Sequence, residues 1–407
     1  METSRFAPST FPHLEPVAGV TSASTSCNLK SDGQRDLLVM AVEADSAVAG
    51  VFTQSTVTSY AVNRCRRSVH GARARALVVH AGNANALTGS QGRMLVERIC
   101  ESVADSLGCP SEEVFMAGTG IIGERVRDEQ ILELLPGLVG GLGDVAWDEA
   151  AEAIGTTDTF PKGASRSFAV GDETIVVSGI AKGSGMIAPD MATMLCFLFT
   201  NAAVDADELR KVLTYANVES FCRISVDGDE STSDTMLLFA THAADLGAGG
   251  DREAALGQLR AVVADVAFDL AMQVVSDGEG ISKVVKVTVH GARTGDDAYV
   301  MAKSIAESPL VKTAIAGGHA NWGRIAMAVG KTHRPVLQER LAIWLGDHRV
   351  AVDGDRDEAV DGDALTAYMT QDHIDVAVEV GMGHESATVW TCDLTARYID
   401  INAHYST

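Results

Sequence analysis

The sequence predicts a mixed α and β fold in which helices cover β-sheets. Short apolar runs of strand length alternate with segments whose apolar residues recur at helical spacing, and the breaks between them are short. The chain has 407 residues, of which 46% are hydrophobic and 21% charged. This composition is typical of a globular protein, and the length allows two or more domains of roughly 100–200 residues. No repeat, linker or break in composition marks a domain boundary.

Five elements are expected in the first third of the chain. Residues 35–44 and 74–83 read as strands, and the apolar run of the second leads into a glycine turn. Residues 92–108 show helical spacing and stop at a glycine, a common signal for a helix C-terminus. A short buried strand is expected at 114–117 and a short helix at 128–138.

The same alternation continues to the C-terminus. Asp205 is the expected N-cap of a helix that runs to residue 217, because acidic residues follow it in the first turn. Further helices are expected at 252–275 and 296–308, and strands at 173–181, 193–202, 235–243 and 283–292.

Charge and cysteine usage narrow the class of protein. The formal net charge is −23, and so acidic a surface repels phosphate backbones and anionic lipid. The N-terminal residues lack the features of a signal peptide, and no run reaches the ~18 apolar residues of a membrane span. Seven widely spaced cysteines fit reduced thiols. The sequence therefore predicts a soluble cytoplasmic protein that binds neither nucleic acid nor membrane.

Two sequence motifs resemble ligand-binding sites but lack residues that those sites require. The GTGIIG stretch at 118–123 matches a dinucleotide fingerprint, but the region ~20 residues later is not the strand that should carry the acidic partner. A glycine-rich turn whose amides face inward and can hold an oxyanion is the better interpretation. The acidic stretch at 353–364 resembles a calcium loop but has Glu358 at the sixth position and Ala364 at the twelfth. The eleven histidines show no metal spacing, so no metal site is expected.

Four polar segments remain. Each of them, considered alone, is explained by a turn rich in Asp, Gly and Ser. Taken together, they predict loops that converge on one site. They are TTDTFPK (156–162), KGSGMIAPDMATML (182–195), RISVDGDESTSDT (223–235) and SDGEGISK (276–283).

These segments resemble the glutamate N-acetyltransferase (ornithine acetyltransferase) family, from about residue 15 to Thr407. So do HAGNANALTG (80–89), AGTGIIGE (117–124), SPLVKTAI (308–315), NWGRIAMAVGK (321–331) and CDLTARYIDINAHYST (392–407). The resemblance implies an α/β (α+β) fold with two lobes and facing β-sheets covered by helices, the ornithine acetyltransferase / DmpA-like fold. It also implies self-cleavage into residues 1–192 and 193–407, which remain together as part of a dimer of cleaved protomers.

Thr193 is the predicted nucleophile. A threonine hydroxyl needs an adjacent base at neutral pH, and a chain-terminal threonine carries one in its own α-amino group. That amine has an unperturbed pKa of about 7.7–8.0, close to working pH. In the uncut chain the same nitrogen is a non-basic amide, so cleavage between Ala192 and Thr193 must come first. Attack of the hydroxyl on the Ala192 carbonyl gives an ester that water hydrolyses, and the small residues Ala192, Gly183 and Gly185 let the backbone reach that geometry.

The resemblance implies acetyl transfer from N2-acetyl-L-ornithine to L-glutamate in the cyclic arginine pathway, through an acyl-Thr193 intermediate. It implies an oxyanion hole formed by Thr119 and Gly120. No cofactor is expected, and acetyl-CoA is left open as an alternative donor. The implied substrate-binding residues are Thr156 (with Thr157 as an alternative), Lys182, Thr193, Glu279, Asn402 and Thr407. Of these, Lys182 can face a substrate carboxylate and Glu279 a substrate amine.

Five positions depart from the family pattern and leave the choice of substrate open: Leu87, Gly118, Gly155, Cys222 and His319. A paralogue that acylates another amine in specialised metabolism is therefore a second interpretation. A hydrolase of the same class, which passes the acyl group to water, is a third. A metabolite-binding protein without turnover is a fourth, and the retained residue pair at 192–193 argues against it.

Overall fold

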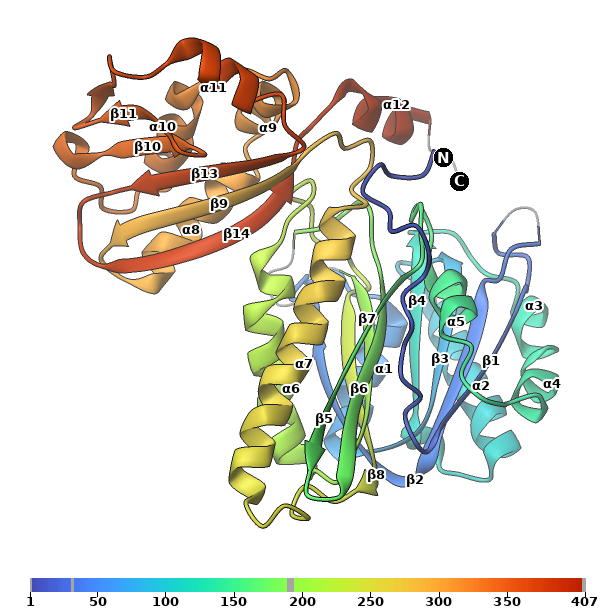
Figure 1. Ribbon diagram of the computed structural model, residues 1–407. Coiled ribbons are helices and arrows are strands. Elements are labelled where there is room, and N and C mark those ends of the chain that lie inside the picture. Colours follow the sequence, from blue (N-terminus) through green and yellow to red (C-terminus); the bar gives the residue numbers. More distant parts are fainter. Residues whose placement is uncertain (1, 31–32, 189–193, 405–407) are drawn as a thin grey trace. The chain divides into compact units, whose positions relative to one another are not determined.

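The computed structural model describes residues 2–30, 33–188 and 194–404, and the chain divides into two compact units (Figure 1). The first unit is formed by Ala7–Cys222 and Glu230–Val274. The second unit is formed by Glu2–Phe6, Arg223–Asp229 and Val275–Thr407.

The first unit is built on an eight-stranded sheet with the order β4-β3-β2-β8-β7-β6-β5, in which β1 also pairs with β2. Neighbouring strands run antiparallel except for the parallel pairs β3/β4 and β7/β8. The strands are β1 (Val20–Thr25), β2 (Leu37–Phe52), β3 (Arg73–Asn83), β4 (Val114–Ile121), β5 (Lys162–Val170), β6 (Glu173–Lys182), β7 (Leu195–Ala202) and β8 (Thr235–Ala244).

Helices cover both faces of this sheet because its strands alternate apolar side chains between two cores. In β3, Leu77 and Val79 join the core under α5, whereas Ala76 and Val78 join the core with α1, α2, α3 and α4. Helix α7 lies along β5, where the Gln273 side chain exchanges hydrogen bonds with the backbone of Gly163 at 3.0 and 3.2 Å. The helices are α1 (Tyr60–Ser68), α2 (Gly89–Leu107), α3 (Asp128–Leu132), α4 (Leu135–Gly140), α5 (Trp147–Ile154), α6 (Ala206–Glu219) and α7 (Arg252–Val275).

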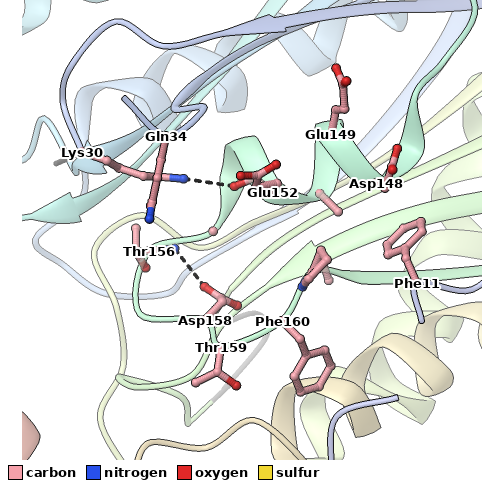
Figure 2. A pocket seen from close by; sticks show the side chains of 14 residues that line it. Phe11, Lys30, Gln34, Asp148, Glu149, Glu152, Thr156, Asp158, Thr159 and Phe160 are labelled. Carbon is pink, nitrogen blue, oxygen red and sulfur yellow. Dashed lines mark hydrogen bonds between the residues drawn. The ribbon is translucent and has the colours of Figure 1, made fainter. Parts of the chain in front are cut away.

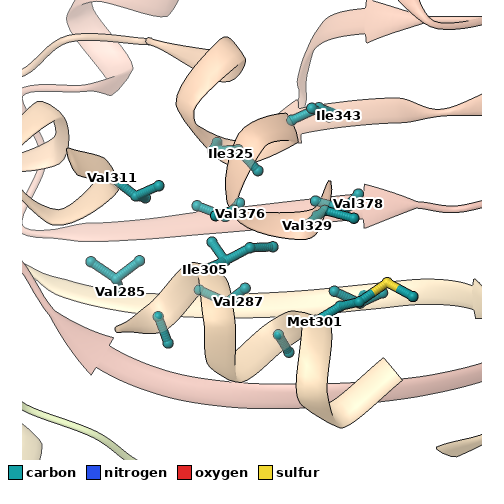
Figure 3. Close-up of a cluster of buried hydrophobic side chains, with 14 of the residues drawn as sticks. Val285, Val287, Met301, Ile305, Val311, Ile325, Val329, Ile343, Val376 and Val378 are labelled. Atoms are coloured by element: carbon teal, nitrogen blue, oxygen red, sulfur yellow. The ribbon is translucent and has the colours of Figure 1, made fainter. Parts of the chain in front are cut away.

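The second unit has a six-stranded sheet with the order β12-β11-β10-β13-β9-β14 and its own apolar core (Figure 3). Val285 and Val287 of β9 pack there with Met301 and Ile305 of α8. The strands are β9 (Val284–Ala292), β10 (Ala342–Leu345), β11 (His348–Val352), β12 (Asp355–Arg356), β13 (His373–Glu379) and β14 (Glu385–Cys392). The helices are α8 (Gly295–Ala306), α9 (Pro309–Ala316), α10 (Trp322–Gly330), α11 (Gly362–Tyr368) and α12 (Ala396–His404).

The predicted fold class is confirmed, since the chain forms two sheets covered by helices. Asp205 caps α6 as expected, accepting a hydrogen bond of 2.8 Å from the Glu208 N–H. The prediction of a glycine-rich turn at 118–123 was wrong at its start, because β4 continues through Gly118 to Ile121 in parallel pairing with β3. The helix expected at 128–138 is two helices, because a proline in the first turn of α4 cannot sit inside a longer helix.

The two predicted cleavage products do not coincide with the two compact units. Strands β6 and β7 lie on either side of the predicted cut, yet they pair with each other in the first unit. The chain of 193–407 therefore contributes strands to both sheets. None of the described helices is both long and apolar enough to cross a membrane.

Candidate active site

The residues predicted to form an oxyanion hole lie where β4 ends against β3. Gly120 pairs with Gly82, and the register between the strands shifts at this point. Both glycines have positive φ angles, 125° and 113°. A Cβ atom on Gly120 would stand 2.3 Å from the Gly82 carbonyl carbon, so only glycine fits. Such irregularities often re-aim the backbone beside an active site.

Lys182 reaches Thr119 from the end of β6. Its ammonium donates a hydrogen bond of 3.1 Å to the Thr119 hydroxyl, and both side chains are buried. An ammonium group can only donate, so the Thr119 oxygen is the acceptor. The hydroxyl hydrogen of Thr119 can therefore point to another acceptor, as an oxyanion hole requires.

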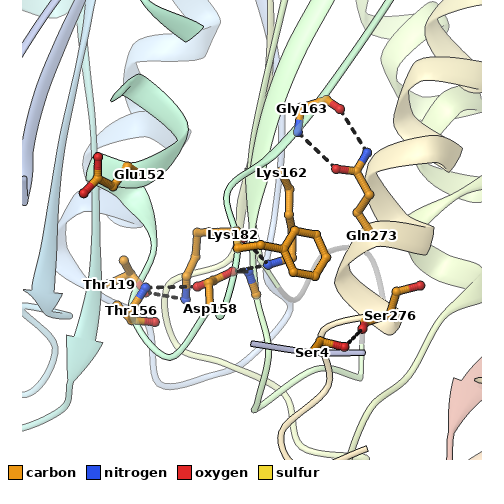
Figure 4. A network of polar contacts seen from close by, with 12 residues as sticks. Ser4, Thr119, Glu152, Thr156, Asp158, Lys162, Gly163, Lys182, Gln273 and Ser276 are labelled. Atoms are coloured by element: carbon orange, nitrogen blue, oxygen red, sulfur yellow. Dashed lines mark hydrogen bonds and ion pairs between the residues drawn. The ribbon is translucent and has the colours of Figure 1, made fainter. Parts of the chain in front are cut away.

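Asp158 is the centre of the polar network around this pair (Figure 4). Its Oδ1 accepts hydrogen bonds from the Lys162 ammonium at 2.6 Å and from the Gly183 N–H at 2.7 Å. Its Oδ2 accepts one of 2.9 Å from the Thr156 N–H. One carboxylate thus connects the loop of Thr156, the first residue of β5 and the residue that follows Lys182.

The charge of Asp158 is held by its cationic neighbours. Burial alone raises the pKa of such a carboxyl group, but Lys162 and Lys182 act in the opposite direction and outweigh it, so the pKa of Asp158 lies below its ordinary value. Lys162 is fully buried and its ammonium also stands 4.7 Å from the centre of the Phe160 ring. The Asp158 carboxyl group is therefore ionised at neutral pH.

A pocket of about 500 Å³ opens beside this network, lined by residues that include Phe11, Thr156, Asp158 and Phe160 (Figure 2). Lys30 also lines it, but its ammonium donates to the backbone carbonyls of Arg35, Glu152 and Ala153 at 2.7, 3.0 and 3.5 Å. Burial lowers the pKa of Lys30. Three further carboxylates make the lining acidic: Asp148, Glu149 and Glu152.

The structure separates the two threonines between which the sequence did not decide. Thr156 lines the pocket, whereas Thr157 is buried and is not among the lining residues. The position of Thr156 therefore suits contact with a small molecule better than that of Thr157.

The second unit holds Glu279 and Asn402 together. The Asn402 side-chain amide donates a hydrogen bond of 2.7 Å to the Glu279 carboxylate, which is buried. Two residues that lie 123 positions apart in the sequence thus form one polar pair. The predicted residues Ala192, Thr193 and Thr407 lie outside the described residues.

Sequence reasoning missed Asp158 and Lys162 as partners, although TTDTFPK places them four residues apart. It also missed Asp234, which directly precedes β8 and is almost fully buried. Burial raises the pKa of Asp234 well above its ordinary value, and its Oδ2 has no hydrogen-bond partner among the described residues. The next residue, Thr235, donates its N–H to the Met194 carbonyl at 2.9 Å, so Asp234 lies beside the start of β7.

The five departures from the family pattern lie in different places. Gly118 of β4 lies against the His80 ring of the neighbouring strand β3, and Gly155 lines the pocket. Leu87 is 66% exposed with a φ of +58°, in the loop after β3. Cys222 accepts a hydrogen bond of 3.3 Å from the Asn217 side chain. His319 follows the end of α9 in the second unit.

The described residues contain no group of three or more His, Cys, Asp or Glu side chains arranged to hold a metal ion. The described groups around Thr119 and Asp158 are buried cations, hydroxyls and backbone amides. Such groups bind carboxylates and stabilise an oxyanion.

Comparisons with known proteins agree with the motifs. The ArgJ family model matches residues 21–407. The arginine biosynthesis bifunctional proteins ArgJ of Mesorhizobium japonicum and Brucella suis are 46% and 45% identical over 406 residues, which cover 99% of this chain and 98% of each relative. The crystal structure of the protein of that name from Bacillus halodurans is 35% identical, covers 52% of this chain and 100% of that chain, and has a TM-score of 0.48. The chain belongs to the ArgJ family, the glutamate N-acetyltransferase (ornithine acetyltransferase) family that its motifs resemble.

Proposed function

We propose that the protein transfers an acetyl group from N2-acetyl-L-ornithine to L-glutamate through an acyl-Thr193 intermediate, after cleaving itself between Ala192 and Thr193. Family membership over residues 21–407 supports acetyl transfer in arginine biosynthesis. The observation that carries the proposal is the hydrogen bond between Lys182 and Thr119 at the end of β4. It places the buried Lys182 ammonium against the Thr119 hydroxyl, and Gly120 is the next residue in the chain.

The segment that contains the proposed cleavage site joins two neighbouring strands. Lys182 ends β6 and pairs with Leu195, the first residue of β7. In the proposed reaction the Thr193 hydroxyl oxygen attacks the Ala192 carbonyl carbon, and its proton passes to the departing nitrogen, which leaves an ester. Water hydrolyses that ester to a carboxylate at Ala192 and a free hydroxyl and amino group at Thr193.

The free α-amino group then serves as the base for acetyl transfer. It takes the Thr193 hydroxyl proton while the oxygen attacks the donor's acetyl carbonyl, and it returns the proton to the departing ornithine amine. The Thr119 hydroxyl and the Gly120 N–H stabilise the oxyanion, and one such donor is typically worth about 3 kcal/mol. The amine of glutamate then attacks the acyl ester by the reverse route.

The remaining predicted residues bind the two amino acids in this proposal. Lys182 binds a substrate carboxylate, and Thr156 contributes from the edge of the pocket. Glu279, oriented by Asn402, binds a substrate amine. Thr407 completes the set as the last residue, and acetyl-CoA is an alternative acetyl donor.

Three further properties follow the family resemblance. The cleaved chains stay together, two cleaved protomers pair, and the enzyme works in the cytoplasm. The same chemistry with a different acceptor amine is a second candidate, because Gly155, one of the departures from the family pattern, lines the pocket.

An assay of wild-type protein, Thr193→Ala and the matched control Thr214→Ala tests the proposal. Thr214 lies on the exposed surface of α6, and its hydroxyl donates a hydrogen bond of 2.8 Å to the Arg210 carbonyl of the same helix. With N2-acetyl-L-ornithine and L-glutamate, wild type and the control should form equal amounts of ornithine and N-acetylglutamate, and Thr193→Ala should form neither. A fully active Thr193→Ala variant would rule out the covalent route. Release of acetate despite saturating glutamate would identify a hydrolase instead.

A further inference from the structure

Three buried charged side chains lie in one network of the first unit: Asp158, Lys162 and Lys182. Asp158 and Lys162 are 6% and 0% exposed, and their charged atoms are 2.6 Å apart. Lys182 is 9% exposed and donates to Thr119. A buried charge is tolerated only where partners and hydrogen bonds hold it, so this network has one favoured arrangement.

The Asp158 carboxylate controls the backbone at two functional positions. It accepts the N–H of Thr156 and the N–H of Gly183, the residue after Lys182. Both hydrogen bonds are charge-assisted, which makes them shorter and stronger than bonds between neutral groups. Thr156 and Lys182 come from different segments, and this carboxylate fixes the backbone at both of them.

Lys162, together with Lys182, stabilises the charge of Asp158, but it does not account for this geometry. Its ammonium bonds the carboxylate, the Phe160 carbonyl at 3.3 Å and the face of the Phe160 ring. These contacts keep the carboxylate ionised inside the protein. The hydrogen bonds from the Thr156 and Gly183 N–H groups depend on the position and charge of the Asp158 carboxylate. An acceptor at 158 that is uncharged or displaced would form them less well.

We propose that Asp158 is a positioning residue of the transfer reaction, whose carboxylate holds Thr156 and the backbone next to Lys182 in the arrangement that binds the amino-acid substrates. This inference rests on the proposed function. Asp158 acts through these two residues and does not itself touch the reacting atoms.

Four variants separate positioning from simple charge balance: Asp158→Asn, Asp158→Glu, Lys162→Met and the double variant Asp158→Asn/Lys162→Met. Each is tested for unfolding temperature, for ornithine binding by calorimetry and for KM and kcat in the transfer assay. Asp158→Asn should raise KM and the ornithine Kd by roughly tenfold to a hundredfold, with a smaller change in kcat. Asp158→Glu keeps the charge but moves the carboxylate, so it should not restore binding.

The double variant is the decisive comparison, because it removes both charges of the Asp158–Lys162 pair, so that neither member of this pair is left buried without the other. We expect its unfolding temperature to be higher than that of Asp158→Asn and at least as high as that of Lys162→Met, while its KM and Kd stay raised. Wild-type affinity in Asp158→Asn, recovery of affinity in the double variant, or recovery in Asp158→Glu would each overturn the inference.

The proposed function is judged separately, on wild-type protein alone. If wild type binds ornithine but transfers no acetyl group, the proposed function fails, and the affinity of the variants still decides the role of Asp158. If wild type neither binds ornithine nor transfers acetyl, both proposals are wrong.

Discussion

His80 lies fully buried in β3, the neighbour in the sheet of the strand β4 that carries Thr119 and Gly120, and it pairs with Gly118. Its imidazole occupies space that only a glycine at position 118 leaves, since a Cβ atom there would stand 2.7 Å from the ring. Neither ring nitrogen has a hydrogen-bond partner among the described residues. Burial therefore lowers the pKa of His80 to about 4, and the ring is neutral at physiological pH.

This neutral histidine should make stability depend on pH. Below its ordinary pKa of about 6.5 the unfolded chain binds a proton that the native protein does not, so the free energy of unfolding falls as pH drops from about 6.5 towards 4. Between about pH 8 and pH 5 the wild type should lose about 2 kcal/mol more than His80→Gln. Urea unfolding at the two pH values measures the difference.

The exposed His13 provides the matched control, because its side chain is 83% exposed. His13→Gln should lose as much stability as wild type over the same pH range. Equal losses in wild type and His80→Gln would contradict the assignment of a neutral, buried His80.

The family resemblance of the sequence motifs predicts roles for Thr119, Lys182 and Glu279, and these roles stay predictions. It did not indicate the contacts that hold these residues in place. The roles of Asp158 and His80 depend on neighbours across the sheet. The partner of Asp158 at Gly183 lies 25 residues away, and Gly118 lies 38 residues from His80. No local pattern records such pairings.

At the scale of elements, the loop at 276–283 is held by the C-terminal segment. Gly280 has a φ of +71°, and a Cβ atom there would stand 2.8 Å from the backbone nitrogen of Tyr398 at the start of α12. The Gly280 carbonyl accepts a hydrogen bond of 2.6 Å from Thr395, and Asp393 accepts one of 2.8 Å from the Ser282 N–H. The loop at 276–283 and the segment at 393–398, which are far apart in the sequence, therefore pack together and fix the position of Glu279.

Removing the Asn402 side chain should weaken substrate binding through Glu279. Asn402→Ala deletes the hydrogen bond of 2.7 Å to the buried carboxylate, and a bond to a charged group is worth about 1.5–3 kcal/mol. We expect KM for the amino-acid substrates to rise by about tenfold or more, with kcat less affected. Steady-state kinetics against His404→Ala, an exposed residue of the same helix, provides the control. An unchanged KM would mean that the pair serves only the packing of α12.

The elements themselves were easier to predict than their ends. Long apolar runs located β6, β7 and α7 within a few residues, because elements that are buried over most of their length are apolar over most of their length. It missed the extension of β4 through Gly118 and Gly120, because glycine is unfavourable in strands. The close approach of Gly82 and Gly120 is the tertiary contact that overrides this preference.

At the scale of the whole molecule, the two predicted cleavage products are interleaved in one sheet. The neighbours β8 and β7 from 193–407 lie between β2 and β6 from 1–192 in the strand order. Cleavage at 192–193 would leave the backbone ladders β2/β8 and β6/β7 intact. The products can therefore separate only when the sheet itself unfolds, and they should elute together under native conditions.

The most direct test of the covalent mechanism is an intact-mass measurement under denaturing conditions. Protein that elutes as one native peak is mixed with N2-acetyl-L-ornithine alone and quenched during the reaction. We predict two chains, 1–192 and 193–407, with one acetyl group on the second chain that disappears when L-glutamate is added. A single full-length chain that nevertheless transfers acetyl, or two chains with no acetyl group on 193–407 during turnover, would contradict the mechanism.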